Sequence, residues 1–265
     1  PVSELPLTVL DVRNTAVSDL APLRGKALNY LSFQNTGVTD LSPLRGMPLR
    51  SLMFAGCRIE NLEDLRGMPL EAIDMYKCQI TDFSPLAGMP LRQLDASMTP
   101  LHDLAILKGM PLQDLKIGST TVEDLAPLQG MPLEWLIMNE TGVTDLTPLR
   151  GLPLKRLTAS STPINDLSPL AGMALEVLSI GNMPITSIAV LEGMPLVTLR
   201  LENCKDLEDL RPIANCTTLE TLTIPDHLTD IEFLRQLPNL KQLDTRAPQM
   251  RTPTQFWADW DRTKH

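Results

Sequence analysis

The chain repeats itself with a fixed period of 21 residues. A period of this size marks supersecondary units that stack and bury their apolar sides against one another. It therefore predicts one elongated solenoid, where a length of 265 residues alone would suggest two globular domains. The repeat is marked by a leucine at Leu7, Leu28, Leu49, Leu70, Leu91, Leu112, Leu133, Leu154, Leu175 and Leu196 and, after one longer copy, at Leu219 and Leu240.

One copy, residues 28–48, shows the frame, and we number its places 1 to 21 from its first leucine. Leu31 and Phe33 alternate with Ser32 at places 4 to 6, and this period of two predicts a short strand with its apolar side chains on one side. Thr36 holds place 9 and Val38 place 11. The copy therefore reads L-x-x-L-x-L-x-x-T-x-V.

This frame resembles the leucine-rich-repeat signature, L-x-x-L-x-L-x-x-N/C-x-L. The resemblance covers about nine tenths of the chain and implies an α/β solenoid of about twelve strands. We expect a leucine-rich-repeat horseshoe with a parallel concave β-sheet and short helical turns or loops on the convex side. The solenoid is expected to span residues 1–247, followed by a C-terminal aromatic capping tail over residues 248–265.

The second half of each copy predicts a single helical turn. In the copy 28–48, Asp40 precedes the apolar pair Leu41 and Leu44, Pro43 lies in the first turn, and Gly46 ends it. Because aspartate suits the start of a helical turn, we interpret the aspartate row as structural. The row is Asp19, Asp40, Asp82, Asp103, Asp124, Asp145, Asp166 and Asp209.

Composition and charge exclude several classes of protein. Apolar residues make up 43% of the chain and aromatic residues 4%, which fits thin leucine layers and excludes a disordered chain. The net charge of −9 argues against nucleic acid as a partner, because a phosphate backbone requires a basic surface. No apolar run approaches the roughly 18 residues of a membrane span, so we expect no membrane insertion. The chain starts PVSELPL without signal-peptide features, and we expect further sequence upstream to cover the first copy.

Three of the four cysteines replace the threonine of place 9, where a small polar side chain bonds backbone groups after the strand. Cys57 and Cys78 are neighbours in this row, so a disulfide between them stays open. Neither end of the chain carries a cysteine cluster, and a reducing cytoplasm is slightly favoured over an extracytoplasmic location. The three histidines show no ligand spacing, so no metal is expected.

The sequence contains no nucleophile elbow, phosphate-binding loop or kinase motif, and the recurring glycines are repeat punctuation. We therefore expect no cofactor and no enzymatic activity. Asp74 and Asp95 fall on adjacent strands, where like charges would raise one pKa. An enzyme with a carboxylate site on the concave face is kept as a remote alternative.

The copies differ at places 3, 5 and 7, which flank the inward leucines and face solvent. Variation on a fixed frame is what an interaction surface requires. We expect Trp135 and Ile137, ringed by Asp114, Lys116 and Arg156, to form one cluster, because an aromatic anchor with a charged rim is typical of protein interfaces. A second cluster is nearer the amino end. The predicted partner-binding residues are Tyr30, Met53, Asp74, Tyr76, Asp95, Asp114, Lys116, Trp135, Ile137 and Arg156.

After Leu240 the chain leaves the repeat, and Phe256, Trp257 and Trp260 are expected to lie over the last leucine layer. The run D-L-S-P-L-x-G resembles internalin-like repeats. Copies ending G-M-P-L before a T-P-x-x-F-W tail resemble the leucine-rich regions of planctomycete-type bacterial serine/threonine kinases. That resemblance implies a recognition or scaffolding arm attached to a signalling enzyme. We expect a non-catalytic module that binds a protein or peptide, and we expect it to be monomeric. An internalin-like adhesin is the alternative.

Overall fold

The structure is a computed structural model that describes residues 7–246 and 250–263. The chain divides into two compact units, Pro1–Leu133 and Glu134–His265, and each is described by itself. The predicted start of the capping tail, at residues 247 and 248, lies outside the described residues. None of the described helices is long and apolar enough to cross a membrane.

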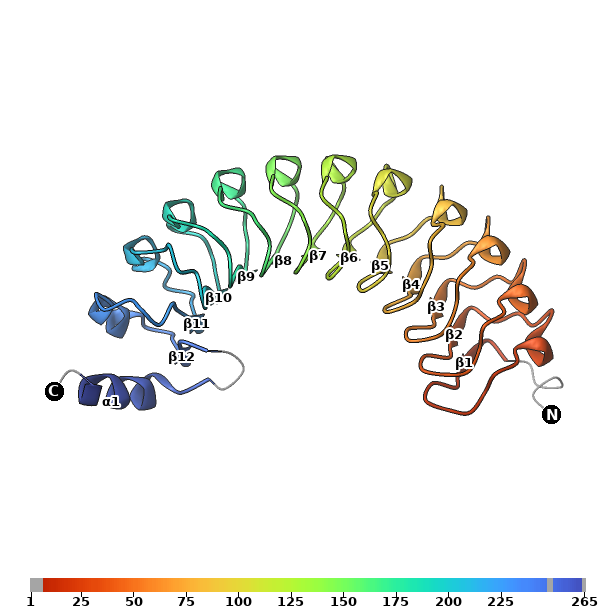
Figure 1. Ribbon diagram of the computed structural model, residues 1–265, viewed down its shortest axis with the longest axis horizontal. Helices are drawn as coiled ribbons and strands as arrows, with labels where there is room; N and C mark the ends of the chain where they lie inside the picture. The colour runs from red at the N-terminus through yellow and green to blue at the C-terminus, as the bar shows by residue number, and fades with distance from the viewer. Residues whose placement is uncertain (1–6, 247–249, 264–265) are drawn as a thin grey trace. The chain divides into compact units, whose positions relative to one another are not determined.

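The first unit contains six short strands that pair in parallel and in chain order (Figure 1). Each strand covers places 3 to 5, which is one place earlier than the alternation at places 4 to 6 predicts. Equal places of neighbouring copies pair, as Leu31 does with Leu52. The strands are β1 (Val9–Asp11), β2 (Tyr30–Ser32), β3 (Ser51–Met53), β4 (Ala72–Asp74), β5 (Gln93–Asp95) and β6 (Asp114–Lys116). Between and after them lie the 3₁₀ helices η2 (Ala21–Leu23), η3 (Ser42–Leu44), η4 (Glu63–Leu65), η5 (Ser84–Leu86), η6 (Ala105–Leu107) and η7 (Ala126–Leu128).

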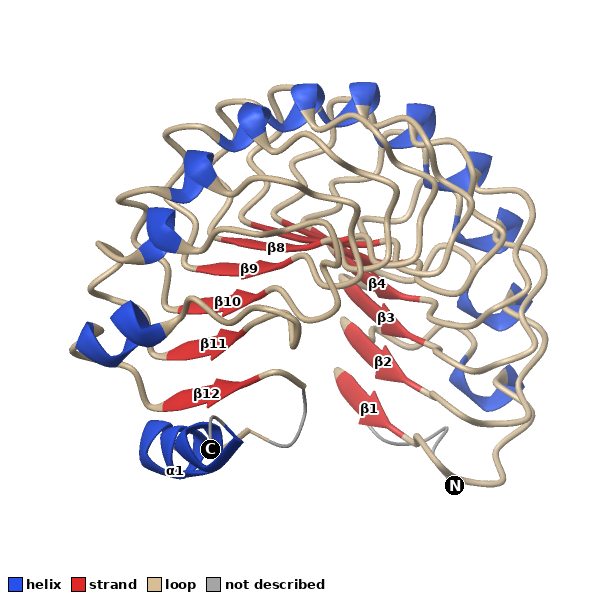
Figure 2. Ribbon diagram, turned by 60° about the vertical axis from the view of Figure 1, so that its left-hand side comes forward, coloured by secondary structure: helices blue, strands red, loops and turns tan. Residues whose placement is uncertain are grey.

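The second unit repeats the pattern and adds a helix. Its parallel strands are β7 (Trp135–Ile137), β8 (Arg156–Thr158), β9 (Val177–Ser179), β10 (Thr198–Arg200), β11 (Thr221–Thr223) and β12 (Gln242–Asp244). Its helices are η8 (Thr147–Leu149), η9 (Ser168–Leu170), η10 (Ala189–Leu191), η11 (Arg211–Ile213), η12 (Glu232–Gln236) and α1 (Pro253–Thr263). In each unit the strands line one side and the 3₁₀ helices the other (Figure 2). The predicted parallel sheet with short helical turns opposite it is confirmed.

The core of each unit is the set of frame positions. Leu28, Leu31 and Phe33 are fully buried, and the ring of Phe33 stacks on that of Phe54 in the next copy at 5.9 Å. The methionine at place 20, such as Met47 at 3% exposure, also belongs to the core, although it is not part of the repeat frame L-x-x-L-x-L-x-x-T-x-V. The first copy is less covered: Val9 is 57% exposed, as expected for a copy that has a neighbour on one described side.

The predicted aspartate row is structural, as expected. Asp40 Oδ1 accepts a hydrogen bond from the backbone N–H of Ser42 at 2.8 Å, and this bond holds the pKa of Asp40 below its ordinary value. Each of the eight aspartates accepts a hydrogen bond from the backbone N–H two residues later, which belongs to the first residue of the following 3₁₀ helix. The aspartate therefore stabilises the start of that helix.

The residues of place 9 form the predicted ladder. Thr36 Oγ1 donates to the carbonyl of Phe33 at 2.7 Å, and the other threonines of the row make the same bond. Cys57 and Cys78 are free and buried; Cys57 Sγ donates to the same Phe33 carbonyl, in the preceding copy, at 3.2 Å. Burial raises the pKa of Cys78 to about 12, so this thiol is poorly reactive.

The residue at place 8 has a left-handed backbone conformation that the sequence does not predict. In the copies from Asn14 to Asn203 its φ lies between +54° and +71°, a region that favours glycine and asparagine. Lys77 and Met98 adopt it too, with φ of 60° and 55°. Because the stacked neighbours fix the bend after every strand, the backbone holds this conformation even where the side chain disfavours it.

We predict that Met98→Asn stabilises the protein by about 0.5–1 kcal/mol, because asparagine tolerates the left-handed region better than methionine. Urea unfolding followed by far-UV circular dichroism measures the change. Asn35→Met, the reverse exchange at the same place of another copy, should lower stability. A loss of stability in Met98→Asn would contradict the account.

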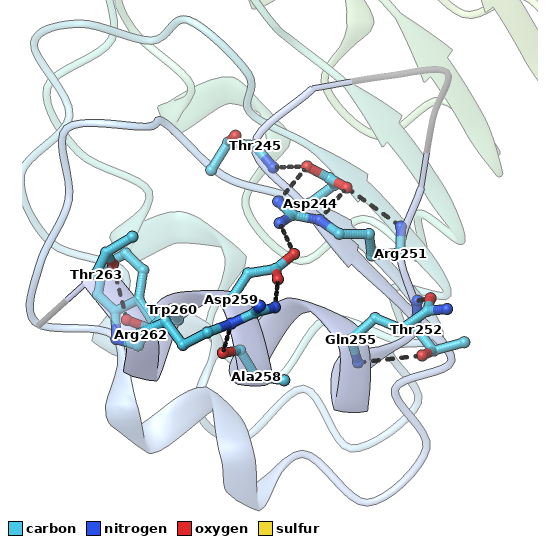
Figure 3. A network of polar contacts seen from close by, with 10 residues as sticks. All are labelled: Asp244, Thr245, Arg251, Thr252, Gln255, Ala258, Asp259, Trp260, Arg262 and Thr263. Atoms are coloured by element: carbon cyan, nitrogen blue, oxygen red, sulfur yellow. Dashed lines mark hydrogen bonds and ion pairs between the residues drawn. The ribbon is translucent and has the colours of Figure 1, made fainter.

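The chain after β12 returns to the last strand and covers it (Figure 3). Leu243 pairs antiparallel with Arg251, and Phe256 and Trp257 of α1 are buried. The Arg251 guanidinium donates to both oxygens of Asp244, each at 2.8 Å, and to Asp259 Oδ2 at 2.9 Å. Burial alone would raise the pKa of Asp244, but the bonds from Arg251 outweigh it and lower that pKa.

Arg251→Gln should cost about 1–3 kcal/mol, because it leaves the buried Asp244 carboxylate without its charged donor. A lowered carboxyl pKa supplies stability above about pH 4 that is lost as pH falls through the folded pKa, so the variant should lose stability most at neutral pH. Hydrogen exchange of the α1 amides reports the loss. Arg211→Gln, which breaks the exposed Arg211–Asp209 pair, serves as the control and should change little. Equal protection of α1 in the Arg251 and Arg211 variants would contradict a capping role for Arg251.

Candidate functional site

The outward residues of the strands, at places 3 and 5, form a surface that we call the sheet face. Because equal places pair across neighbouring strands, each place makes a row of side chains running across the strands. In the first unit, Met53 pairs with Asp74, Asp74 with Asp95, and Asp95 with Lys116. The sheet face therefore sets three charged side chains side by side at the strand spacing.

These residues line a depression of about 140 Å³ on the sheet face between β3 and β6. Charged side chains line it from places 3 and 5, and the core residues Ile73 and Leu94, each 2% exposed, also belong to its lining. At place 3, the short side chain of Ala72 stands between Ser51 and Gln93, which leaves room in that row. The lining residues are Met53, Ala72, Ile73, Asp74, Gln93, Leu94, Asp95, Asp114 and Lys116.

Two of the three carboxylates are held by hydrogen bonds. Asp74 accepts from the backbone N–H of Tyr76 at 3.0 Å and from Gln34 Nε2 at 2.5 Å. Asp95 accepts from the backbone N–H of Ser97 at 3.0 Å, and its Oδ2 lies 3.7 Å from Lys116 Nζ. Both carboxylates are thus oriented by backbone groups that the repeat fixes in place.

Asp114 is different, because one of its oxygens has no donor. Its Oδ1 is inaccessible to solvent and has no hydrogen-bond partner among the described residues. Burial raises the pKa of Asp114, which Lys116 partly offsets. Burial also raises the pKa of Asp74, and the charge of Asp95 adds to this, so the expected perturbation of the Asp74–Asp95 pair is confirmed with burial as its main cause.

The second unit carries the predicted residues Trp135, Ile137 and Arg156. Trp135 on β7 pairs with Arg156 on β8, and the Arg156 guanidinium lies 5.2 Å from the centre of the Trp135 ring. Ile137 pairs with Thr158. Trp135 is half-buried, and the long side chain of Arg156 covers part of its ring.

The remaining predicted residues lie beside the depression. Tyr76 follows β4 and is 40% exposed, and Tyr30 on β2 is half-buried; neither lines the depression. The structure brings Asp114 and Lys116 together with Asp74 and Asp95, whereas the sequence grouped them with Trp135. Ala72 lines the depression but was not among the predicted residues. Its small size in a row of larger side chains is the sequence feature that marks it.

The arrangement gives the depression a charged lining. Among the described residues, no group of three or more histidine, cysteine, aspartate or glutamate side chains is placed to hold a metal ion. The chemistry that the depression supplies is hydrogen-bond acceptance and negative charge.

No known family profile matches the chain, and the comparison with curated proteins finds no significant match. Among solved structures, the chain is similar to an internalin (inlF) from Listeria monocytogenes str. 4b F2365, with a TM-score of 0.77, 24% identity, and 90% of this chain and 80% of that chain covered. A leucine-rich-repeat protein from Leptospira interrogans is similar with a TM-score of 0.57 and 15% identity, covering 95% of this chain and 81% of that one.

A third similar structure is the leucine-rich-repeat ectodomain of the receptor kinase GASSHO1/SCHENGEN3 from Arabidopsis thaliana, in complex with CASPARIAN STRIP INTEGRITY FACTOR 2. The TM-score is 0.57 at 16% identity, with 85% of this chain and 37% of that chain covered. At such identities the likeness shows the fold alone. That fold is the leucine-rich-repeat solenoid that the repeat frame predicts.

Asp114→Asn should leave the free energy of unfolding at pH 7 unchanged within about 0.5 kcal/mol, or raise it, because the raised pKa means that the folded protein disfavours the charge. The advantage should shrink as pH falls and the carboxyl takes up its proton in the folded state. Urea unfolding at neutral and acid pH measures both. A loss above about 1 kcal/mol at pH 7 would show that the carboxylate serves stability.

Proposed function

We propose that this protein is a non-catalytic module that binds a protein or peptide on its sheet face. The observation that carries the proposal is the depression between β3 and β6, which is lined by partly buried carboxylates. Such groups weaken the folded state and therefore point to a role in recognition.

The repeat frame supports this assignment by elimination. The leucines, the residues of place 9 and the aspartate row each have a structural partner, so they are not free to vary. The sheet face is free to vary, and the two units carry different chemistry on it: carboxylates in the first, Trp135 and Arg156 in the second. A rigid sheet with adjustable side chains is a common way to build a binding surface.

The similar Arabidopsis ectodomain is in complex with CASPARIAN STRIP INTEGRITY FACTOR 2, which shows that this fold holds such a partner in that protein. For the present chain we infer a recognition or scaffolding arm of a larger bacterial signalling protein. This finer assignment rests on the resemblance of the G-M-P-L copies and the T-P-x-x-F-W tail to regions that follow bacterial kinase domains. In this assignment residues 248–265 act as a cap, and the module is monomeric.

An internalin-like adhesin is the second candidate, favoured by the likeness to the Listeria internalin. The sequence that flanks this chain in its gene separates the two. An adjoining kinase domain supports the signalling arm, whereas a secretion signal with a wall anchor supports the adhesin and overturns the signalling arm. Neither result shows whether the partner binds to the sheet face, so that part of the proposal needs its own experiment.

We predict that Trp135→Ala and Tyr76→Ala each weaken partner binding by about tenfold or more, as expected for aromatic contacts at an interface. A photo-crosslinking amino acid at Gln93 identifies the partner in an extract of the source cells, and calorimetry with the purified partner measures the affinity. Gln129→Ala, at the end of η7, serves as the control. Circular dichroism should show that all three variants remain folded. If the partner binds both aromatic variants as tightly as the Gln129 variant, this choice of residues is wrong.

A further inference from the structure

The depression between β3 and β6 has a charge that specifies its occupant. Asp74, Asp95 and Asp114 supply three carboxylates, and Lys116 supplies one ammonium group. When all are ionised, the lining carries two net negative charges. Lys116 Nζ lies nearest to Asp95, at 3.7 Å, so it balances one carboxylate of the three most directly.

The hydrogen-bond pattern calls for a donor. Asp74 has both oxygens engaged, whereas Asp114 Oδ1 is shielded from water and has no partner among the described residues. An acceptor left unpaired in this way costs free energy. A group with N–H donors in the depression would recover that cost once the Asp114 side chain turned Oδ1 toward it. The occupant must therefore donate hydrogen bonds as well as carry positive charge.

The size and the lining restrict the occupant further. A volume of about 140 Å³ is close to the roughly 150 Å³ of a cavity that holds benzene, so a flat, ring-sized group fits it. Met53 and Ala72, at the outward places 5 and 3, offer apolar contact. A guanidinium group combines these properties, since it is planar, weakly hydrated on its faces and carries five N–H donors at its edge.

We propose that this depression binds an arginine side chain of the partner. The proposal rests on the proposed function and deepens it, since it names the chemistry that the first unit selects. Charge complementarity supports it, because the chain as a whole carries a net charge of −9, which draws cationic segments toward the sheet face. Bidentate pairing with the carboxylates then fixes the guanidinium in the depression.

The test uses the full chain with ¹³C-methyl methionine and the probe peptide acetyl-Gly-Gly-Arg-Gly-Gly-amide. The methyl group of Met53 reports on the depression, and that of Met98, which is 41% exposed and outside the lining, reports non-specific binding. We expect the Met53 resonance alone to shift and to saturate at millimolar peptide. The same peptide with citrulline, which keeps the shape but not the charge, should shift neither resonance.

The matched variants are Asp95→Asn with Asp114→Asn, against Glu60→Gln with Glu123→Gln. Both pairs remove two charges from the first unit, but Glu60 and Glu123 are exposed at place 12, outside the sheet face. The aspartate pair should weaken peptide binding at least about tenfold, and the glutamate pair should leave it within about twofold. Thermal unfolding confirms that both variants are folded.

Several results would overturn the proposal: no Met53 shift with the arginine peptide, equal shifts with the citrulline peptide, or equal weakening by both variant pairs. A lysine peptide that binds as tightly would show an unselective acidic surface and would also overturn the arginine assignment. The proposed function fails separately. If the crosslinked partner still depends on Trp135 while the arginine peptide does not bind, only the arginine inference is lost.

Discussion

The structure depends on the covering of one copy by the next. A single 21-residue copy has a three-residue strand and a one-turn 3₁₀ helix, and neither is stable alone. Stacking equal places at the strand spacing buries the leucines, pairs the strands and places each Thr36-type hydroxyl on its carbonyl. Every frame residue therefore serves its neighbours as well as its own copy. After β12, Arg251 pairs with Leu243 and donates to Asp244, and α1 packs against this strand.

The sequence predicts this part well because the period repeats each constraint many times. The short strand, which lies within one place of its predicted position, the aspartate that starts each 3₁₀ helix and the hydroxyl ladder all follow from one copy. The sequence does not predict the left-handed backbone at place 8. Asn35 favours that conformation, but Lys77 and Met98 hold the same place in other copies and do not favour it. There the stacked neighbours override the local propensity of the residue.

The candidate site was predicted less completely, for a physical reason. A list of outward residues gives their rows but not how deeply each side chain sits, which depends on the lengths of the side chains beside it. Ala72 leaves room for the depression, while Arg156 covers part of Trp135. Asp74, Asp95 and Asp114 could thus be named from the sequence. The buried oxygen of Asp114, and the grouping of Asp114 and Lys116 with Asp74 and Asp95, needed the structure.

The central claim is that fold and recognition occupy separate places of the repeat. Urea unfolding of two multiple variants of the first unit tests it. One carries Tyr30→Thr, Met53→Thr and Asp95→Thr on the sheet face, and the other carries Thr36→Ala, Thr99→Ala and Thr120→Ala in the ladder. The account predicts that the sheet-face variant keeps its unfolding free energy within about 1 kcal/mol, while the ladder variant loses about 1 kcal/mol for each hydroxyl removed. Equal losses in the two variants would contradict it.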